Sequence, residues 1–406
     1  KIYDTPMQAA KSSSELPLTK KLGVNVVGYF KGEFGVGQFG RLVARSAIAS
    51  GLPVTTLVNR RTESRQDEEF ELTDSKALYP VTIGSINADQ FALWLDEIPS
   101  EVKAHSKFVG VWAWEIESFP KHMHAAFEHV DEVWAISSFV RDSMQPHTRK
   151  PVLVFPCPII APVISEKLDR SAIGIREDDE FNLFMFDFFS IFRRKNPLDL
   201  IEAHILAFPN ETGPKLIIKT INGQNHASQQ EQLRYAVGTR KDIILINSYM
   251  SREQLHSLLS ECQTYISLHR SEGYGLTLAE AMSLGKPVIA TAYSGNMDFM
   301  SEQNSILVPY ELVEVGNDAF PYPEDSRWAQ PNIEFAAHAM RKLNEDESLR
   351  SRIGSQARID VATEFTMERA AEFTRVRVEN LSKKHFIKKL NKEIWKWRKK
   401  RYFFSR

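Results

Sequence analysis

The chain has 406 residues, 43% of them hydrophobic, and its 51 basic and 52 acidic residues leave a net charge of −1. Such a chain is long enough to bury two cores of ordinary domain size, and its balance gives no overall attraction to nucleic acid or membrane. Its two cysteines, Cys157 and Cys262, exclude a disulfide framework and a cysteine zinc site. Because no apolar run reaches roughly 20 residues and no signal-peptide core opens the chain, we expect a cytoplasmic protein.

Strand and helix patterns alternate in the first half. After a polar leader at 1–20, apolar runs of parallel-strand length and helical patterns follow, with strands expected at 23–30, 54–58, 108–112 and 132–136 and helices at 41–50 and 121–129. The segment 151–165 carries four prolines and breaks this rhythm. It is expected to be a last strand that runs into a linker, so the first domain is placed at 21–165.

The same rhythm restarts in the second half. Strands are expected at 181–189, 216–220, 243–246 and 264–268, and helices at 197–207, from 252, at 276–284, 335–343 and 350–365. This order predicts a second domain at 166–365, a cross-over helix at 366–382 and a basic tail at 383–406. The expected fold class is α/β with two doubly wound parallel sheets.

The stretch 271–296, SEGYGLTLAEAMSLGKPVIATAYSGN, places two carboxylates around a glycine turn. Gly273 and Gly275 allow the backbone to approach a ligand, and the helix that follows presents free amides to an anion such as a phosphate. Glu272 lies before the turn and Glu280 within the helix, and each carboxylate can accept two hydroxyl hydrogen bonds. The spacing therefore suits a diphosphate flanked by two polyols.

With the following GKPVIAT and SGN, this pair resembles the donor-site signature of retaining glycosyltransferases of family 4, which have the GT-B fold. The resemblance implies two Rossmann-like domains facing a cleft, with C-terminal helices crossing back to the first. It also implies a UDP- or GDP-sugar donor, no metal, Glu272 on the transferred sugar and Glu280 on the ribose. The diphosphate would lie on the backbone of the donor loop, at Gly273, Tyr274, Gly275, Leu276 and Thr277. Solvated glutamates on a strand–turn–helix unit are the alternative.

Positive charge is needed where the diphosphate leaves, and Lys195 is the candidate. Relatives usually carry an arginine five residues earlier, where this chain has Ser190. Either Arg193 or Arg194 is positioned to supply the missing charge, although a helix start with solvated arginines is equally compatible. Lys219, at the end of a strand, is predicted to point into the cleft or to be a surface lysine.

The first domain offers two further segments. In KGEFGVGQFG, Gly35 and Gly37 are predicted to bring the backbone close to a donor phosphate or an acceptor, unless the loop is only a tight turn; Glu33 and Arg41 face the cleft or solvent. In VWAWEIESFP, Glu115 and Glu117 stand where many relatives have a histidine. Glu115 is predicted to orient or deprotonate an acceptor hydroxyl, the alternative being solvated glutamates beside packing tryptophans.

Three histidines and one turn complete the candidates. His269 and the turn at 294–296 are predicted to line the donor site because they lie close to Glu272 in sequence. His122 and His124 have neither the spacing nor the context of a metal pair and are expected at the surface.

The tail repeats apolar residues at helical spacing among lysines and arginines. This composition favours a helix on an anionic membrane surface; the alternatives are packing on the first domain and contact with nucleic acid. The overall prediction is a cytoplasmic, peripherally membrane-bound hexosyltransferase that acts on a saccharide, glycolipid or lipid-linked glycan in cell-surface polysaccharide or glycoconjugate synthesis. Its rivals are a GT-B phosphorylase or epimerase, an inactive scaffold that binds sugar nucleotides at the membrane, and a nucleic-acid-binding protein.

Overall fold

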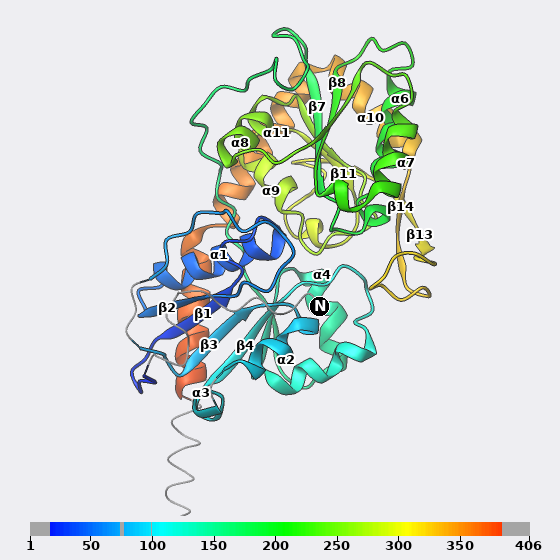
Figure 1. Ribbon diagram of the computed structural model, residues 1–406. Coiled ribbons are helices and arrows are strands. Elements are labelled where there is room, and N and C mark those ends of the chain that lie inside the picture. The colour runs from blue at the N-terminus through cyan, green and yellow to red at the C-terminus, as the bar shows by residue number, and fades with distance from the viewer. Residues whose placement is uncertain (1–16, 74–76, 99, 384–406) are drawn as a thin grey trace, which may run out of the picture.

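A computed structural model describes residues 17–73, 77–98 and 100–383. The chain forms two units, each built on a six-stranded sheet, and Figure 1 shows the first unit below the second. Both sheets are parallel, as their pairings show. The predicted fold class, two doubly wound parallel sheets, is confirmed.

The first sheet has the strand order β2-β1-β3-β4-β5-β6. Its strands are β1 (Val24–Gly28), β2 (Val54–Val58), β3 (Val81–Ser85), β4 (Lys107–Trp112), β5 (Glu132–Ala135) and β6 (Val152–Val154). Its helices are α1 (Gly35–Ala49), α2 (Ala88–Asp96), α3 (Ser100–His105), α4 (Ser138–Met144) and the 3₁₀ segments η1 (Lys121–His129) and η2 (Gln145–His147). The chain leaves β1 in one direction and returns to its other side at β3, so a crevice opens where these two strands end.

The second sheet has the order β12-β11-β10-β7-β8-β9. Its strands are β7 (Phe181–Asp187), β8 (Lys215–Ile221), β9 (Ile243–Asn247), β10 (Thr264–Ser267), β11 (Val288–Thr291) and β12 (Ile306–Val308). Its helical segments are α5 (Phe192–Lys195), α6 (Pro197–Ala207), η3 (Gly223–Asn225), α7 (Ala227–Val237), α8 (Arg252–Glu261), α9 (Leu276–Ser283), η4 (Gly295–Asp298), α10 (Ile333–Glu345) and α11 (Glu347–Glu364). The direction of winding reverses between β7 and β10, which places the second crevice at their carboxyl ends.

The apolar runs recognised in the sequence are these strands, and most side chains of β1, β5, β7 and β10 are buried. Two expectations are corrected. Helix α1 begins at Gly35 rather than at residue 41, so Gly35 and Gly37 lie in its first turn and not in a loop. The segment at 121–129 has the expected bounds but is a 3₁₀ helix.

The helix at 367–383 crosses back and packs on the first sheet. Its Phe373 lies edge-on to Trp134 of β5, with ring centroids 5.0 Å apart. Arg377 forms an ion pair with Glu132, which also accepts a hydrogen bond from Trp134 Nε1 at 2.9 Å. The chain thus passes between the units twice, and the two crossings touch, because Ile159 N–H donates to Phe365 O at 2.9 Å.

A two-stranded hairpin, β13 (Tyr310–Glu314) and β14 (Arg327–Pro331), extends from the second unit toward the first (Figure 1). Its loop carries Tyr322, whose ring packs against Trp114 of the first unit with centroids 5.3 Å apart. Ser326 and Ser118 add a hydroxyl contact of 3.0 Å between the same segments. The hairpin therefore bridges the two units at one side of the space between them.

Over the residues that the structure describes, none of the helices combines the length and the apolar character needed to cross a bilayer. The predicted membrane-binding tail lies outside the described residues, apart from its first position, Lys383. Membrane attachment therefore stays a prediction.

Candidate active site

The loop between β10 and α9 forms the centre of the site, at the crevice of the second sheet. Gly275 precedes α9 in a left-handed conformation with φ of 97°, a region open to glycine at little cost. No side chain of the described residues caps α9, so its first-turn amides are available to an external acceptor. Gly285, with φ of 74°, follows the end of this helix, as its sequence position predicts.

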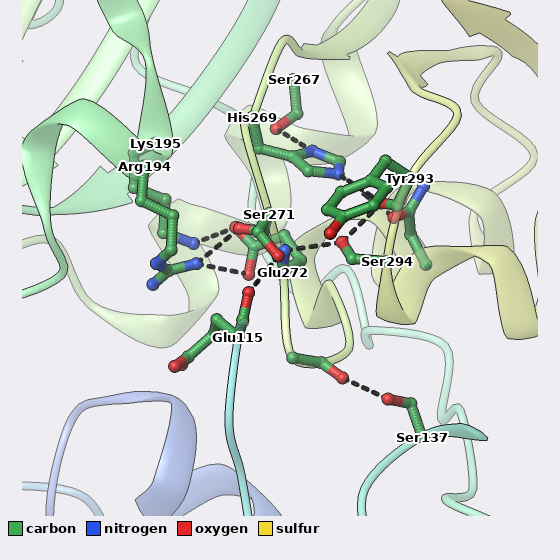
Figure 2. A network of polar contacts seen from close by, with 12 residues as sticks. Glu115, Ser137, Arg194, Lys195, Ser267, His269, Ser271, Glu272, Tyr293 and Ser294 are labelled. Atoms are coloured by element: carbon green, nitrogen blue, oxygen red, sulfur yellow. Dashed lines mark hydrogen bonds and ion pairs between the residues drawn. The ribbon is translucent and has the colours of Figure 1, made fainter. Parts of the chain in front are cut away.

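Glu272 is held by two cations (Figure 2). Lys195 Nζ donates to Glu272 Oε1, and Arg194 Nη1 lies 3.3 Å from Glu272 Oε2. Burial alone would raise the pKa of Glu272, but the charges of Lys195 and Arg194 lower it to about 2. The structure therefore brings together the first glutamate of the signature and the predicted basic residues, although 77 positions separate Lys195 from Glu272.

The choice between Arg193 and Arg194 follows from their contacts. Arg193 turns away, because its guanidinium donates to Asn317 O at 2.5 Å and lies 5.3 Å from the ring of Trp328. Arg194 is buried and donates to Ser271 O at 2.8 Å. Ser190 lies in the loop after β7 and lines the same pocket as Arg194. Arg194 is thus the arginine placed beside Glu272.

Lys219 is buried within β8, with 3% of its surface exposed, so its prediction as a surface lysine is wrong. Its ammonium donates to Thr220 O at 3.2 Å. Burial lowers the pKa of Lys219 to about 8, while the charge of Asp187 acts in the opposite direction. Lys219 therefore lies in the carboxyl half of β8, the strand next to β7, and the segment after β7 carries Arg194 and Lys195.

Glu280 lies half-buried in α9. Within the part of the chain that the structure describes, its carboxylate makes no hydrogen bond or ion pair. Burial raises the pKa of Glu280 to about 7, and the charges of Arg252 and Arg41 oppose that rise. An acceptor group without a partner in this position can receive hydroxyl hydrogen bonds from a ligand.

The side chain of His269 is committed to the protein. Its Nε2 lies 3.1 Å from Asn296 Oδ1 and 3.4 Å from Tyr293 O, both acceptors, so Nε2 carries the proton. Its Nδ1 then accepts from Ser267 Oγ at 3.1 Å. Burial lowers the pKa of His269, which keeps the ring neutral. The ring nitrogens of His269 thus hold the turn at 294–296, where Ser294 Oγ accepts from the Glu272 amide at 2.8 Å, and contact of His269 with a donor stays a prediction.

Two donor-loop residues contact the first unit. Tyr274 packs against Phe39 of α1, with ring centroids 5.4 Å apart, and its hydroxyl donates to Cys157 O at 3.5 Å. A Cβ on Gly273 would lie 3.1 Å from Ile136 Cδ1, and Gly273 O accepts from Ser137 Oγ at 2.7 Å. Gly273 thus permits close packing of the two units, where the sequence predicted room for a ligand.

The glycine-rich segment before α1 is fixed from within. Arg41 is buried and donates to Phe30 O at 3.0 Å and Gly32 O at 2.9 Å, and burial lowers its pKa to about 10. A Cβ on Gly37 would lie 2.5 Å from Gly32 O, so Gly37 serves the turn itself. Gly35, in contrast, has no described atom within 4 Å of the place where its Cβ would be. Arg41 therefore does not face solvent, and its charge acts on Glu280 of the donor site.

Glu115 reaches the site from the first unit. Its backbone carbonyl accepts from Ser271 Oγ, and its Oε2 accepts from Tyr322 Oη at 3.0 Å (Figure 2 shows Glu115 below Arg194). Trp112 and Trp114 are buried, as the packing alternative held, but Glu115 is not a solvated side chain. The role of Tyr322 gave no signal in the sequence, because it lies 207 positions from Glu115 in a loop without a motif.

Glu117 is exposed and lies 4.0 Å from Arg327 of β14. His122 is exposed, whereas His124 is half-buried beside His147, with ring centroids 4.4 Å apart. The expectation of a surface position therefore fits His122 alone. Among the described residues, no group of three or more His, Cys, Asp or Glu side chains is placed to hold a metal ion.

Comparison with known proteins finds sequence similarity in the second unit. Residues 166–318 match the family model of glycosyl transferases group 1, a span that ends inside the β13–β14 hairpin. A stretch of 101 residues is 34% identical to a GDP-mannose:cellobiosyl-diphosphopolyprenol alpha-mannosyltransferase of Xanthomonas oryzae pv. oryzae, covering 24% of this chain and 27% of that protein. The matches span half or less of the length of the curated relatives.

Solved structures share the architecture. Sucrose-phosphate synthase of Thermosynechococcus elongatus superimposes with a TM-score of 0.63 at 14% identity, covering 90% of this chain and 100% of that one. Anabaena HepE, solved with UDP and glucose, gives 0.58 at 14% identity, covering 89% and 100%. At this identity the likeness concerns the fold, which is the GT-B arrangement of two parallel-sheet units.

Proposed function

We propose that this protein is a retaining glycosyltransferase of family 4 that transfers a hexose from a UDP- or GDP-sugar to a hydroxyl of a saccharide, glycolipid or lipid-linked glycan. The observation that carries the proposal is the ion-paired Glu272 beside Lys195 and Arg194 at the uncapped start of α9, with the unpaired Glu280 further along that helix. The match to group 1 glycosyltransferases over the same residues supports it.

The diphosphate is assigned to the start of α9. The first-turn amides and the positive end of the helix favour an anion, and Lys195 adds a full charge beside them. When the glycosidic bond breaks, the leaving diphosphate gains charge, and a cation already in position stabilises that charge more than the bound substrate. Glu280 is then the acceptor for the ribose hydroxyls, and Glu272 for those of the transferred sugar.

Retention of configuration is assigned to same-face attack assisted by the leaving phosphate. A double displacement would need a carboxylate free to attack the anomeric carbon. Glu272 is instead held by two cations that lower its pKa to about 2, which makes its oxygens poor nucleophiles. This pairing supports a route without a covalent glycosyl-enzyme intermediate.

The test is release of nucleoside diphosphate from a panel of UDP-, GDP- and ADP-sugars, with and without a membrane extract as the source of acceptor. We expect slow hydrolysis of one donor, stimulated by the extract. Lys195→Ala should lower the release about a hundredfold or more, while Arg193→Ala, which alters a neighbouring cation that points elsewhere, should leave it intact. Proton NMR of the product reports whether the α-configured donor yields an α-linkage, and a β-linkage would refute retention.

A sugar-nucleotide-binding scaffold is the second candidate. Ser190 and Glu115 stand where the resemblance leads to expect an arginine and a histidine, and both departures lie at the site itself. Nucleotide binding by calorimetry without any turnover across the donor panel would favour this candidate.

Peripheral attachment to the inner face of the membrane is part of the proposal and is tested separately. The lipid-linked acceptor named for the mannosyltransferase relative supports it. Sedimentation with anionic vesicles should carry down the full chain but not a chain ending at residue 383.

A further inference from the structure

A polar pocket lies between the two units. Its volume is about 230 Å³, below the range of about 300–1,000 Å³ typical of sites for drug-sized ligands, so it suits one small ring. It is formed by the carboxyl ends of strands from both sheets and by the β13–β14 hairpin. Its polar lining comes from Asn87, Asp89, Glu115, Ser190, Arg194 and Tyr322.

One donor in this lining is buried and unsatisfied. Only 5% of Arg194 is exposed, and its Nε has no hydrogen-bond partner in residues 17–73, 77–98 and 100–383. A buried donor without a partner costs about 1–3 kcal/mol, and more when charged. The other guanidinium contacts go to Ser271 O and Glu272, and Nε itself is enclosed by protein, so Arg194 lines the pocket as a cation whose position is fixed by those contacts.

The first unit contributes acceptors to the same pocket. Tyr322 donates to one oxygen of Glu115, and the carboxylate has further lone pairs for a ligand donor. Asp89 stands exposed in the first turn of α2. The amide oxygen of Asn87 accepts from Ala113 N–H at 3.0 Å, so its NH₂ group is the part of this side chain left to donate to a ligand.

A hydroxyl-bearing ring matches this arrangement. Each hydroxyl donates one hydrogen bond and accepts others, so one ring can donate to the two carboxylates and accept from the Asn87 amide. An anionic ring is disfavoured, because the lining holds two carboxylates, Glu115 and Asp89, against one cation, Arg194, which also pairs with Glu272.

We propose that this pocket binds a neutral sugar ring of the acceptor, and that Tyr322 of the hairpin is a positioning residue that holds the Glu115 carboxylate toward it. The inference rests on the proposed function and deepens it by naming the acceptor class and the element that selects it. The hairpin strand β14 and Tyr322 lie beyond the span 166–318 that matches the family model.

The ring of Tyr322 is held by packing, so its hydroxyl can be removed without loss of these ring contacts. The residue is 6% exposed, and its ring lies edge-on to Trp114 and Trp328, with centroids 5.3 and 6.4 Å away. Tyr322→Phe keeps this packing and removes only the hydroxyl that donates to Glu115. Tyr310→Phe is the matched control, since Tyr310 lies on β13 of the same hairpin and is 37% exposed.

The experiment compares wild type, Tyr322→Phe, Glu115→Gln and Tyr310→Phe with neutral and uronic-acid oligosaccharide acceptors. For Tyr322→Phe we expect a donor KM and acceptor-free hydrolysis within about twofold of wild type, and for Glu115→Gln a loss of transfer at least as large as that of Tyr322→Phe. Transfer to the neutral acceptor should fall about tenfold or more in kcat/KM, the effect of losing one hydrogen bond to a charged group. Tyr310→Phe should resemble wild type throughout.

Equal losses in donor and acceptor parameters, unchanged transfer in Tyr322→Phe, or a wild-type preference for the uronic-acid acceptor would each overturn the inference. Failure of the proposed function looks different, since wild type would then release no nucleoside diphosphate from any donor. Thermal unfolding of each variant, expected to match wild type within a few degrees, separates these outcomes from loss of folding.

Discussion

Replacing Arg377 by methionine should release the helix at 367–383 from the first unit. Arg377 Nε donates to Glu132 Oε1 at 3.1 Å, and its Nη2 contacts Oε2 of the same carboxylate. Glu132 is 1% exposed, so without Arg377 its charge keeps only the hydrogen bond from Trp134. Methionine is chosen because it fills a similar volume without charge.

The size of the effect follows from this burial. Breaking a buried pair costs about 3–5 kcal/mol when one charge remains uncompensated. Because the Arg377 side chain is 22% exposed and Trp134 still donates, we expect the lower end, about 3 kcal/mol. Hydrogen exchange through local opening should then accelerate about a hundredfold across residues 367–383.

Exchange measured by mass spectrometry on peptides from 367–383 and from β5 tests this directly. Arg375→Met is the control: it lies on the same helix, but its partners Glu372 and Glu379 are solvent-facing, so little change is expected. The double variant Glu132→Gln with Arg377→Met should lose less than Arg377→Met alone, because no buried charge is left. Acceleration below fivefold in Arg377→Met, or equal effects of Arg375→Met, would refute the assigned role of the buried pair.

Three further outcomes are expected. Lys195→Ala should lower kcat about a hundredfold to a thousandfold, measured as nucleoside diphosphate release, because one preorganised donor to developing charge is lost; a change confined to KM would contradict this. Since burial raises the pKa of Glu280 to about 7, its carboxylate ionises as pH rises through that value, and calorimetric affinity for nucleoside diphosphate should increase from pH 6 to 8 more in wild type than in Glu280→Gln, whose own slope serves as the baseline. Gly295→Ala should lower the unfolding temperature strongly, because its Cβ would lie 2.1 Å from Gly273 O, whereas Gly35→Ala, which meets no described atom within 4 Å, should be neutral or stabilising by up to about 1 kcal/mol.

The strands were predictable where burial on both faces gives a mostly apolar run, as in β7 with its sequence FNLFMFD. β3 gave no such signal, although it lies at the centre of the first sheet, because its sequence VTIGS mixes apolar, polar and glycine residues. Its five residues are all buried, so tertiary packing determines this strand more than its own composition. Helix α7, with a single buried residue, has too little apolar periodicity to be found.

The residues of the candidate site also fall into those that the local sequence revealed and those that it did not. Glu272 and Glu280 were identifiable because a local glycine turn and helix start carry the pattern, and Lys195 because the resemblance extends to its segment. Tyr322 and the unsatisfied Arg194 Nε depend on contacts between segments far apart in the chain, and no local spacing encodes them. The partners of His269 were equally hidden, since closeness in sequence to Glu272 does not reveal that both of its ring nitrogens are used within the protein.

The contact between Ile159 and Phe365 has a mechanical consequence. A single covalent connection would join the two units by one segment alone, but two connections tied to each other hold both crossings at one place between the units. Glu115 and Ser271 belong to different units and are joined by a hydrogen bond, so a turn of one unit against the other would break that bond. The tie between the two crossings thus limits the movements by which the two halves of the site can come apart.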